Sequence, residues 1–282
     1  MDIYRDTTAV QFANIDKSDT LTLASTFELF QEAAINHAED LGVGRGALQQ
    51  NGIVWILSRL SVFISCRPAF KKTITTRSWP RGSSKLFAIR DYDIHYADDI
   101  SGREDGPSLD SALVRGRSAW LVLDMEKRKP LRPQIVSEKL PLNEGINALP
   151  GEYAAGNEPP PSLTARDFSM AEPILRKACY SDIDYNGHVN NTRYIQWIQD
   201  LLEPEILTSA EQIRLDINYL AEVLYGETIS LFVVPVEAET MADENPLRLQ
   251  NPCPCKGAFA IEGRRVQEAL SIPVFRAELR TG

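Results

Sequence analysis

The sequence predicts an α+β protein built from two tandem units, each with one amphipathic helix and several antiparallel strands. Three observations carry this prediction. A helical apolar stripe is followed by a series of strand-like runs, a stretch rich in proline and glycine interrupts the chain, and the same order then returns. No sequence identity between the halves is evident, so the predicted repeat is one of element order only.

The first helix is predicted from Ser25 to Leu41, where apolar residues recur at helical spacing. Ser25 and Glu28 form a capping-box pattern at its start, and Gly42 is suited to ending it. The polar stretch 98–111 is predicted to be a loop. Runs of β-branched and aromatic residues predict strands at Trp55 to Cys66, Thr73 to Trp79, Leu86 to His95 and Val114 to Met125.

Residues 134–167 are rich in proline, glycine and small polar side chains, which favour neither helix nor sheet interiors. This stretch is predicted to be a linker crossing the surface between domains at 1–133 and 168–282. In the second domain a helix is predicted from Thr192 to Leu202. Strands are predicted at Ile213 to Leu220, Thr228 to Val236, Ala258 to Val266 and Ile272 to Arg280.

Composition narrows the class of protein. The chain has 282 residues, 43% of them hydrophobic, which suffices for a core, and it has no apolar run long enough for a membrane span. Its charged N-terminus does not resemble a signal peptide, so a cytoplasmic protein is expected. The net charge of −9 argues against nucleic acid as a partner. Cys253 and Cys255 flank a proline without a second ligand pair, which indicates a turn rather than a zinc site.

Basic residues gather between positions 67 and 90. Two interpretations stay open: the charges solvate a sheet edge, where lysine discourages strand pairing, or they form a docking surface for an acidic partner. The docking candidates are Arg67, Lys71, Lys72, Arg77, Arg81 and Lys85.

The segment that indicates chemistry is Ser181 to Asn191. Within it Asp184, Asn186 and His188 occupy alternate positions, as does Asp182 before them, and in an extended chain alternate side chains share one face. A carboxylate, an amide and an imidazole would therefore converge just before a helix.

The backbone N–H groups at the start of that helix are candidates for stabilising an oxyanion, those of Val189 and Asn190 in particular. Together with the polar row, this equipment suits attack on an ester-like carbon.

The sequence disfavours other interpretations of this segment, and two other catalytic or cofactor signatures elsewhere in the chain. Asn186-Gly187 is a hairpin signal, but the following residues predict a helix rather than a returning strand. The pattern from Asp182 matches the front of a calcium loop, yet the twelfth position, which should be Glu, is Arg193. No G-x-S-x-G elbow exists, and the glycines near position 44 follow a helix rather than a strand, so neither a serine hydrolase elbow nor a dinucleotide site is indicated.

The segment Asp182 to Trp197 resembles the signature of the fatty acyl-acyl carrier protein thioesterases. Further similarity extends over most of the chain, at the early helix, residues 55–59, 75–79, 119–128 and 215–226. The resemblance implies two hotdog domains, each a long helix wrapped by an antiparallel sheet. It also implies hydrolysis of a thioester on acyl carrier protein without metal or organic cofactor.

By position, the resemblance makes Asp184, Asn186 and His188 catalytic residues and Glu222 a further acid. The family often has a cysteine after that glutamate, but this chain has Val223, so a thiol mechanism does not transfer. Two mechanisms stay open: Asp184 attacks the carbonyl directly, or water attacks with Asp184 or Glu222 as general base.

The family's acyl chain lies in a tunnel formed by the first domain. Candidates for its lining are Phe27, Phe30, Ile53, Trp55 and Leu57, although for any single one of them ordinary packing of helix on sheet is the better explanation. Alternatives for the whole chain are an acyl-CoA thioesterase and a non-catalytic acyl-binding protein, and homodimer formation stays open. With acyl carrier protein as the partner, the basic stretch gains weight as its docking surface.

Overall fold

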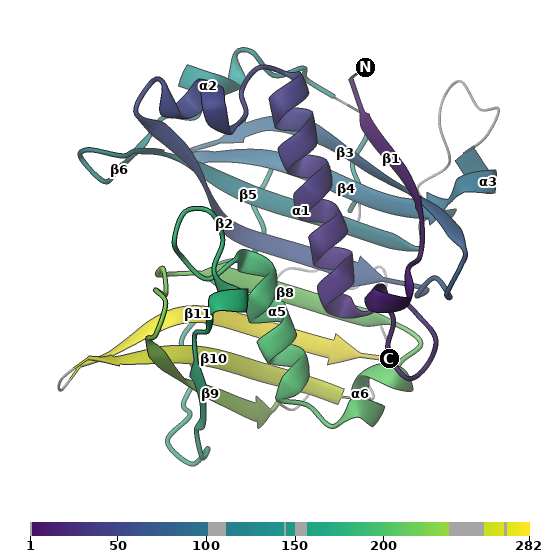
Figure 1. The fold of residues 1–282 in the computed structure, drawn as a ribbon, viewed down its shortest axis with the longest axis vertical. Helices are drawn as coiled ribbons and strands as arrows, with labels where there is room; N and C mark the ends of the chain where they lie inside the picture. The colour runs from purple at the N-terminus through teal and green to yellow at the C-terminus, as the bar shows by residue number, and fades with distance from the viewer. Residues whose placement is uncertain (1, 101–110, 144, 150–156, 237–256, 268–269) are drawn as a thin grey trace. The chain divides into compact units, whose positions relative to one another are not determined.

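A computed structural model describes residues 2–100, 111–143, 145–149, 157–236, 257–267 and 270–282. The chain divides into two compact units, Met1–Pro160 and Pro161–Gly282. In each unit one long helix packs on an antiparallel sheet, as predicted (Figure 1). Within the described residues, no helix has both the length and the apolar character needed to cross a membrane.

Unit 1 is a sheet in the order β1-β3-β4-β5-β2, with β6 pairing to β5. Helix α1 (Leu23–Asp40) lies across this sheet (Figure 1), and the short helix α2 (Arg45–Gln49) follows it. The strands are β1 (Tyr4–Ala9), β2 (Ile53–Ile64), β3 (Thr73–Ser84), β4 (Phe87–Tyr96), β5 (Val114–Asp124) and β6 (Lys129–Leu131). The remaining short helices are α3 (Ala97–Ile100) and α4 (Gln134–Ser137).

Helix α1 begins two residues earlier than predicted. Its N-cap is Thr22, whose side chain accepts a hydrogen bond from the Ser25 amide at 3.0 Å, so the capping role assigned to Ser25 is wrong. The end is as predicted: Gly42 has a φ of 66°, the left-handed conformation that glycine adopts without strain.

Helix α1 packs closely on the sheet at Phe30. Its ring stacks on Tyr92 of β4 with centroids 4.6 Å apart. A Cβ atom at Gly116 of β5 would lie 2.5 Å from this ring. The absence of a side chain at Gly116 therefore allows the helix to pack closely on the sheet. Phe30 and Tyr92 are both almost fully buried.

Unit 2 is a sheet in the order β8-β11-β10-β9-β7, crossed by helix α5 (Asn191–Asp200) (Figure 1). Tyr194 of α5 packs edge-to-face on Phe275, with ring centroids 5.3 Å apart. A short helix, α6 (Pro204–Thr208), follows α5. The strands are β7 (Ile174–Lys177), β8 (Ile213–Tyr219), β9 (Thr228–Pro235), β10 (Gly257–Gln267) and β11 (Leu270–Thr281).

The predicted strands all form, with β3 running on to Ser84, whereas β1, β6 and β7 were missed. Each of these three pairs with a single neighbouring strand, and β1 has four exposed residues among six. An edge strand buries little, so no apolar pattern marks it. Of the predicted loop 98–111, α3 takes the first residues, and 101–110 lie outside the described residues.

The stretch predicted to be a surface linker packs on the sheet of unit 1. Asn143, Ala148 and Leu149 are each at most 3% exposed, so the prediction is wrong for this part. The Trp79 indole donates to the Ile146 carbonyl at 3.1 Å. Side chains of the sheet thus bind the backbone of the segment, and this allows a proline-rich chain to be buried without repeating structure.

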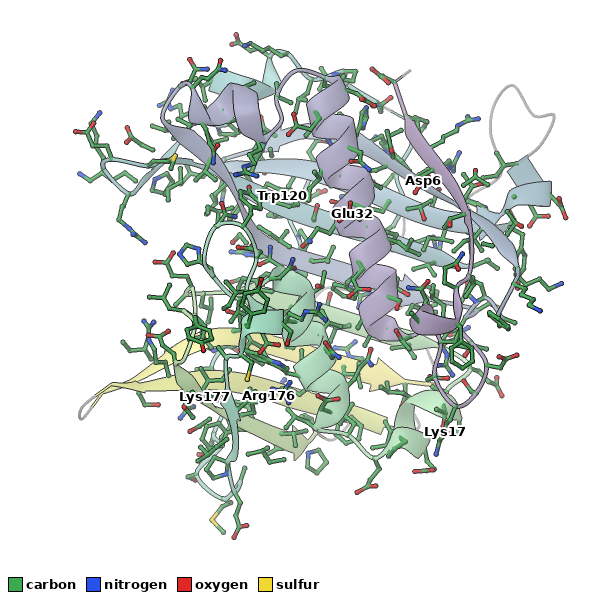
Figure 2. The ribbon with its side chains drawn as sticks, viewed as in Figure 1. Asp6, Lys17, Glu32, Trp120, Arg176 and Lys177 are labelled. Carbon is green, nitrogen blue, oxygen red and sulfur yellow. The ribbon has the colours of Figure 1, made fainter. Side chains whose placement is uncertain are left out.

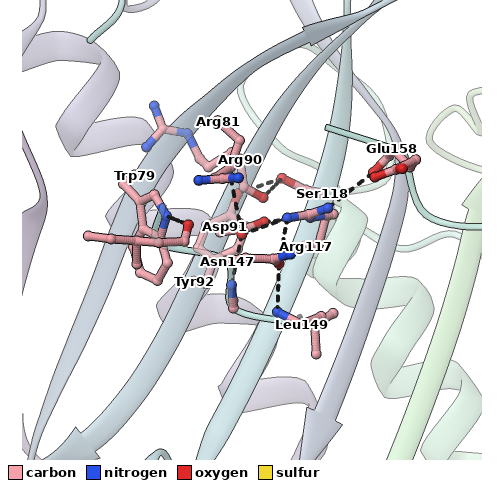
Figure 3. Close-up of polar contacts among 12 residues, drawn as sticks. Trp79, Arg81, Arg90, Asp91, Tyr92, Arg117, Ser118, Asn147, Leu149 and Glu158 are labelled. Atoms are coloured by element: carbon pink, nitrogen blue, oxygen red, sulfur yellow. Dashed lines mark hydrogen bonds and ion pairs between the residues drawn. The ribbon is translucent and has the colours of Figure 1, made fainter. Parts of the chain in front are cut away.

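Arginines of the basic stretch pair with acids on the same sheet. Arg77 bonds to Asp93 at 2.7 Å, and both are buried. Arg117 holds Asp91 through two bonds of 2.6 and 2.8 Å, with Arg81 also beside Asp91 at 3.8 Å (Figure 3).

Arg77 and Arg81 are therefore buried ion-pair partners, and their assignment as docking residues is wrong. Arg67 also pairs with an acid, at 2.7 Å from Asp16. Of the six candidates, the exposed ones are Lys71, Lys72 and Lys85.

Candidate active site

The proposed catalytic residues lie on a tight turn that precedes α5. The Gly187 amide donates to the Asp184 carbonyl at 3.0 Å, and the Asp184 amide donates to the His188 carbonyl at 2.8 Å. Ile183 and Val189 form an antiparallel bridge across the turn. Gly187 has a φ of 82°, which fits a three-residue hairpin loop ending in a left-handed glycine.

Two predictions about this segment are wrong. The hairpin signal at Asn186-Gly187 was set aside, yet the turn forms and closes before the helix begins. The chain is not extended through the polar row, because a 3-10 turn at Tyr180–Asp182 is followed directly by the reversal. Asp182 is buried and accepts a bond from the Cys179 amide at 2.7 Å, so it caps that turn instead of joining the row.

The turn brings the His188 imidazole near a second acid, Glu222. Asp184 is half-buried, and its Oδ1 accepts from the Asn186 amide at 2.8 Å. His188 Nε2 lies 3.3 Å from Glu222 Oε2, with both side chains more than a third exposed. A backbone bridge between His188 and Leu224 fixes the end of the turn against the loop carrying Glu222. The structure thus places an accessible acid–imidazole pair at the turn that carries Asp184.

The two amides predicted to hold an oxyanion are already bonded. The Val189 amide donates to the Val223 carbonyl, and the Asn190 amide donates to the Asp182 carbonyl, each at 2.8 Å. Their assignment is therefore wrong for this conformation. Asn190 instead caps α5, its side chain accepting from the Thr192 amide at 3.0 Å.

Unit 1 contains a second copy of this turn, which the sequence comparison of the halves did not reveal. Asp16, Ser18 and Thr20 take the places of Asp184, Asn186 and His188. The Asp16 amide donates to the Thr20 carbonyl at 3.1 Å, and the Ser18 amide donates to Asp16 Oδ1 at 2.9 Å. Figure 2 labels Lys17, which lies in this turn ahead of α1.

The copy extends beyond the turn itself. Asp19, with a φ of 61°, takes the place of Gly187, and Thr22 caps α1 as Asn190 caps α5. Asp19 occupies the position of Gly187, and Thr20 occupies the position of His188. The two turns therefore share a hydrogen-bond pattern without sharing sequence identity at these positions. The repeat is thus one of backbone structure as well as of element order.

The two copies differ in what surrounds the aspartate. Arg67 Nη1 bonds to Asp16 Oδ2 at 2.7 Å, and Arg67 Nη2 donates to Ser18 Oγ at 3.2 Å. Among the residues that the structure describes, no lysine or arginine forms an ion pair with Asp184. Burial by itself raises the pKa of Asp16, but the bonds from Ser18 and the charge of Arg67 outweigh it, and the net pKa is below its usual value of 3.8. In the first copy, the aspartate is thus bonded to Ser18 and paired with Arg67.

We expect Asp16→Asn to lower the stability of the fold. Because its pKa is lowered on folding, ionised Asp16 stabilises the fold above about pH 4, and this contribution is lost as pH falls through the lowered value. Denaturant unfolding should therefore show a loss of about 1–2 kcal/mol at pH 7 and a smaller difference at pH 3. A variant equally destabilised at both values of pH would contradict the ion-pair account.

Comparison with known proteins decides the family. Residues 1–138 match the acyl-ACP thioesterase N-terminal domain, and residues 173–251 match the acyl-ACP thioesterase C-terminal domain. The chain belongs to the acyl-ACP thioesterase family. The recognition made from the motif is confirmed.

Curated relatives in the family come from plants. An acyl-[acyl-carrier-protein] hydrolase of Cuphea viscosissima is 22% identical over 78% of this chain and 52% of its own length. The oleoyl-acyl carrier protein thioesterase 1 of Arabidopsis thaliana is 23% identical over 80% of this chain and 62% of its own. Both are named as chloroplastic. The chain thus spans about half of the length of the first relative and somewhat more of the second.

Solved structures share the fold over nearly the whole chain. An acyl-ACP thioesterase from Bacteroides thetaiotaomicron has a TM-score of 0.74 at 23% identity, covering 99% of this chain and 98% of its own. The 12:0-ACP thioesterase from Umbellularia californica has a TM-score of 0.68 at 17% identity, covering 99% and 93%. The predicted α+β class, with two hotdog-like helix-on-sheet units, is confirmed.

The acyl-pocket candidates pack in or against the core of unit 1. Phe27, Ile53 and Leu57 are each less than 9% exposed, and Trp55 donates its indole N–H to the Val43 carbonyl at 3.0 Å. These contacts fit ordinary core packing, and a role in an acyl pocket stays a prediction. Cys66 and Cys179 are free and exposed. Cys253 and Cys255 lie outside the described residues.

Proposed function

We propose that the chain hydrolyses the thioester of fatty acyl groups carried on acyl carrier protein, releasing free fatty acid and the carrier thiol. The observation that supports it is the turn of Asp184 and Asn186 beside the His188–Glu222 pair, in a chain of the acyl-ACP thioesterase family. Accessible acid and imidazole groups at hydrogen-bond distance are the equipment that general acid–base catalysis needs.

Two routes are compatible with the geometry. In the first, Asp184 attacks the thioester carbon, the thiolate leaves and takes a proton, and water then hydrolyses the anhydride. In the second, Asp184 or Glu222 removes a proton from water as it attacks. In either route His188, held by Glu222 at 3.3 Å, is the proton donor for the departing thiolate. Appearance of ¹⁸O from labelled water in the Asp184 carboxylate after one turnover would support the first route.

An oxyanion contact from α5 needs a different donor from those expected. The first four N–H groups of a helix have no intrahelical acceptor. Thr192 and Arg193 donate to Asn190 at 3.0 and 2.9 Å, and the Asn190 amide is also engaged. The N–H of Asn191, the first residue of α5, is therefore our candidate for contact with the developing negative charge.

Incubation with a panel of acyl-acyl carrier protein thioesters of different chain lengths, with quantification of free fatty acid, tests the proposal. We expect turnover on the carrier protein, with the same acyl group on coenzyme A hydrolysed more slowly. Equal or faster turnover on coenzyme A would favour the rival acyl-CoA thioesterase. Tight acyl binding without release from either carrier would favour a non-catalytic acyl-binding protein.

The expected specificity for the carrier depends on docking. Lys71, Lys72 and Lys85 are the exposed members of the basic stretch and remain proposed contacts for the acidic carrier protein. We likewise propose that the acyl pocket is lined by Phe27, Phe30, Ile53, Trp55 and Leu57. The chain-length preference measured with the panel of thioesters tests this role.

A further inference from the structure

The loop that carries Glu222 is anchored mainly through its backbone. It joins β8 to β9. The Leu220 amide donates to the Val274 carbonyl and the Gly226 amide to the Ala178 carbonyl, each at 2.9 Å. In the middle, the Val223 carbonyl accepts from Val189 at 2.8 Å, and the Val223 side chain is fully buried. These bonds fix the path of the loop, whereas the Glu222 side chain is 40% exposed.

An ion pair ties this loop to the neighbouring strand. Arg265 of β10 places Nη1 3.1 Å from both carboxylate oxygens of Glu227 and 3.2 Å from the Glu222 carbonyl oxygen. Glu227 Oε2 in turn accepts from the Leu224 amide at 2.8 Å. One guanidinium nitrogen therefore joins the backbone of Glu222 to a carboxylate that holds the next part of the loop.

The Arg265–Glu227 pair is connected to both His188 and Glu222. Leu224, held by Glu227, forms the backbone bridge with His188. Glu222, held by Arg265, is the acid 3.3 Å from the His188 imidazole. The pair therefore bonds to the Glu222 backbone directly and reaches the His188 backbone through Leu224.

We propose that Arg265 and Glu227 are positioning residues that set the distance between Glu222 and His188. This inference rests on the proposed function. Arg265 and Glu227 are 20% and 28% exposed, and ion pairs with such access to water contribute little to stability. A displacement of about 1 Å in a catalytic group, by contrast, can cost up to about 100-fold in rate. The loss of this pair should thus appear in turnover rather than in stability.

The test compares Arg265→Gln and Glu227→Gln with a matched control, Arg166→Gln. Arg166 bonds to Glu278 at 3.0 Å in the same unit, with 28% and 12% exposure, and contacts neither the turn nor the loop by any bond described here. On an acyl-acyl carrier protein thioester, we expect each test variant to lower kcat about tenfold with KM within about twofold. Arg265→Lys should recover part of the loss, and Arg166→Gln should retain the wild-type kcat.

A double-mutant cycle separates positioning from general damage. In a Glu222→Gln background, Arg265→Gln should cause little further loss, because the group that it positions is already gone. Multiplying losses in the double variant, or an equal loss in Arg166→Gln, would overturn the proposal.

A second readout does not require activity. The imidazole NMR signals of His188 should move in the same direction in Arg265→Gln and Glu222→Gln, while those of His37 and His95, in unit 1, stay in place. An unmoved His188 signal in Arg265→Gln would overturn the positioning role. A wild-type protein that releases no fatty acid would refute the proposed function alone, because the NMR signals still test the position of Glu222.

Discussion

Asp184→Ala and Asp184→Asn are both expected to lower kcat by about 100- to 10,000-fold while leaving a folded protein. In the first proposed route the Asp184 carboxylate is the nucleophile, and in the second it is a candidate general base; asparagine supplies neither function. Its structural contribution is small: Oδ1 accepts one amide bond from Asn186, which the asparagine oxygen can keep. The melting temperature of Asp184→Asn should therefore change by no more than about 2 °C, since one exposed hydrogen bond is worth little.

The chain supplies an internal control for this variant. Asp16 has the same backbone bonds in the unit 1 turn but is paired with Arg67. Asp16→Asn should lower stability and keep kcat, the reverse of Asp184→Asn. Cys179→Ala should also keep kcat, and a large loss there would revive a thiol mechanism. An Asp184→Ala variant with near-native kcat would show that the reacting group lies elsewhere.

The sequence predicted the strands that consist of long runs of apolar, β-branched and aromatic residues. Strands β4 and β5 are of this kind, and their predicted limits are within a residue or two of the observed ones. Edge strands β1 and β7 are short and mostly exposed, so their sequences carry no comparable signal. Chain reversal at Asp184 depends on left-handed backbone at Gly187, and the sequence signal for it was present but was overruled by the helix that follows.

Charge pairing across strands was the larger omission. Arg77 lies directly opposite Asp93 in the register of β3 and β4, so these two charges neutralise each other, whereas Lys71, Lys72 and Lys85 of the same stretch stay exposed. The charged residues at alternate positions in 77–81 and in 91–95 are visible in the sequence. Which acid lies opposite which base, however, depends on the register in which β3 and β4 pair. Arg265 of β10 and Glu227, which directly precedes β9, come together only in the folded protein and leave no local signal.

The buried pair of Asp91 and Arg117 should be the most sensitive point for stability in unit 1. Both side chains are fully buried, and the pair makes two bonds. Asp91 Oδ2 also accepts from the Ala148 amide at 3.0 Å, and Arg117 donates to Asn147 Oδ1 at 3.0 Å (Figure 3). One carboxylate thus joins strands β4 and β5 to the segment that covers them, and its loss leaves a buried positive charge without compensation.

We expect Asp91→Asn to destabilise unit 1 by about 3–5 kcal/mol, because removing one partner of a buried pair leaves the other charge unsolvated. Lys127→Ala is the matched control: its pair with Asp124 spans 3.5 Å with the lysine 71% exposed, and its loss should cost less than about 1 kcal/mol. Urea unfolding gives both values, and limited proteolysis of Asp91→Asn should cleave within residues 143–149 first. Equal stability losses in the two variants would mean that the pair is solvated in solution, and that the segment is held by its apolar contacts instead.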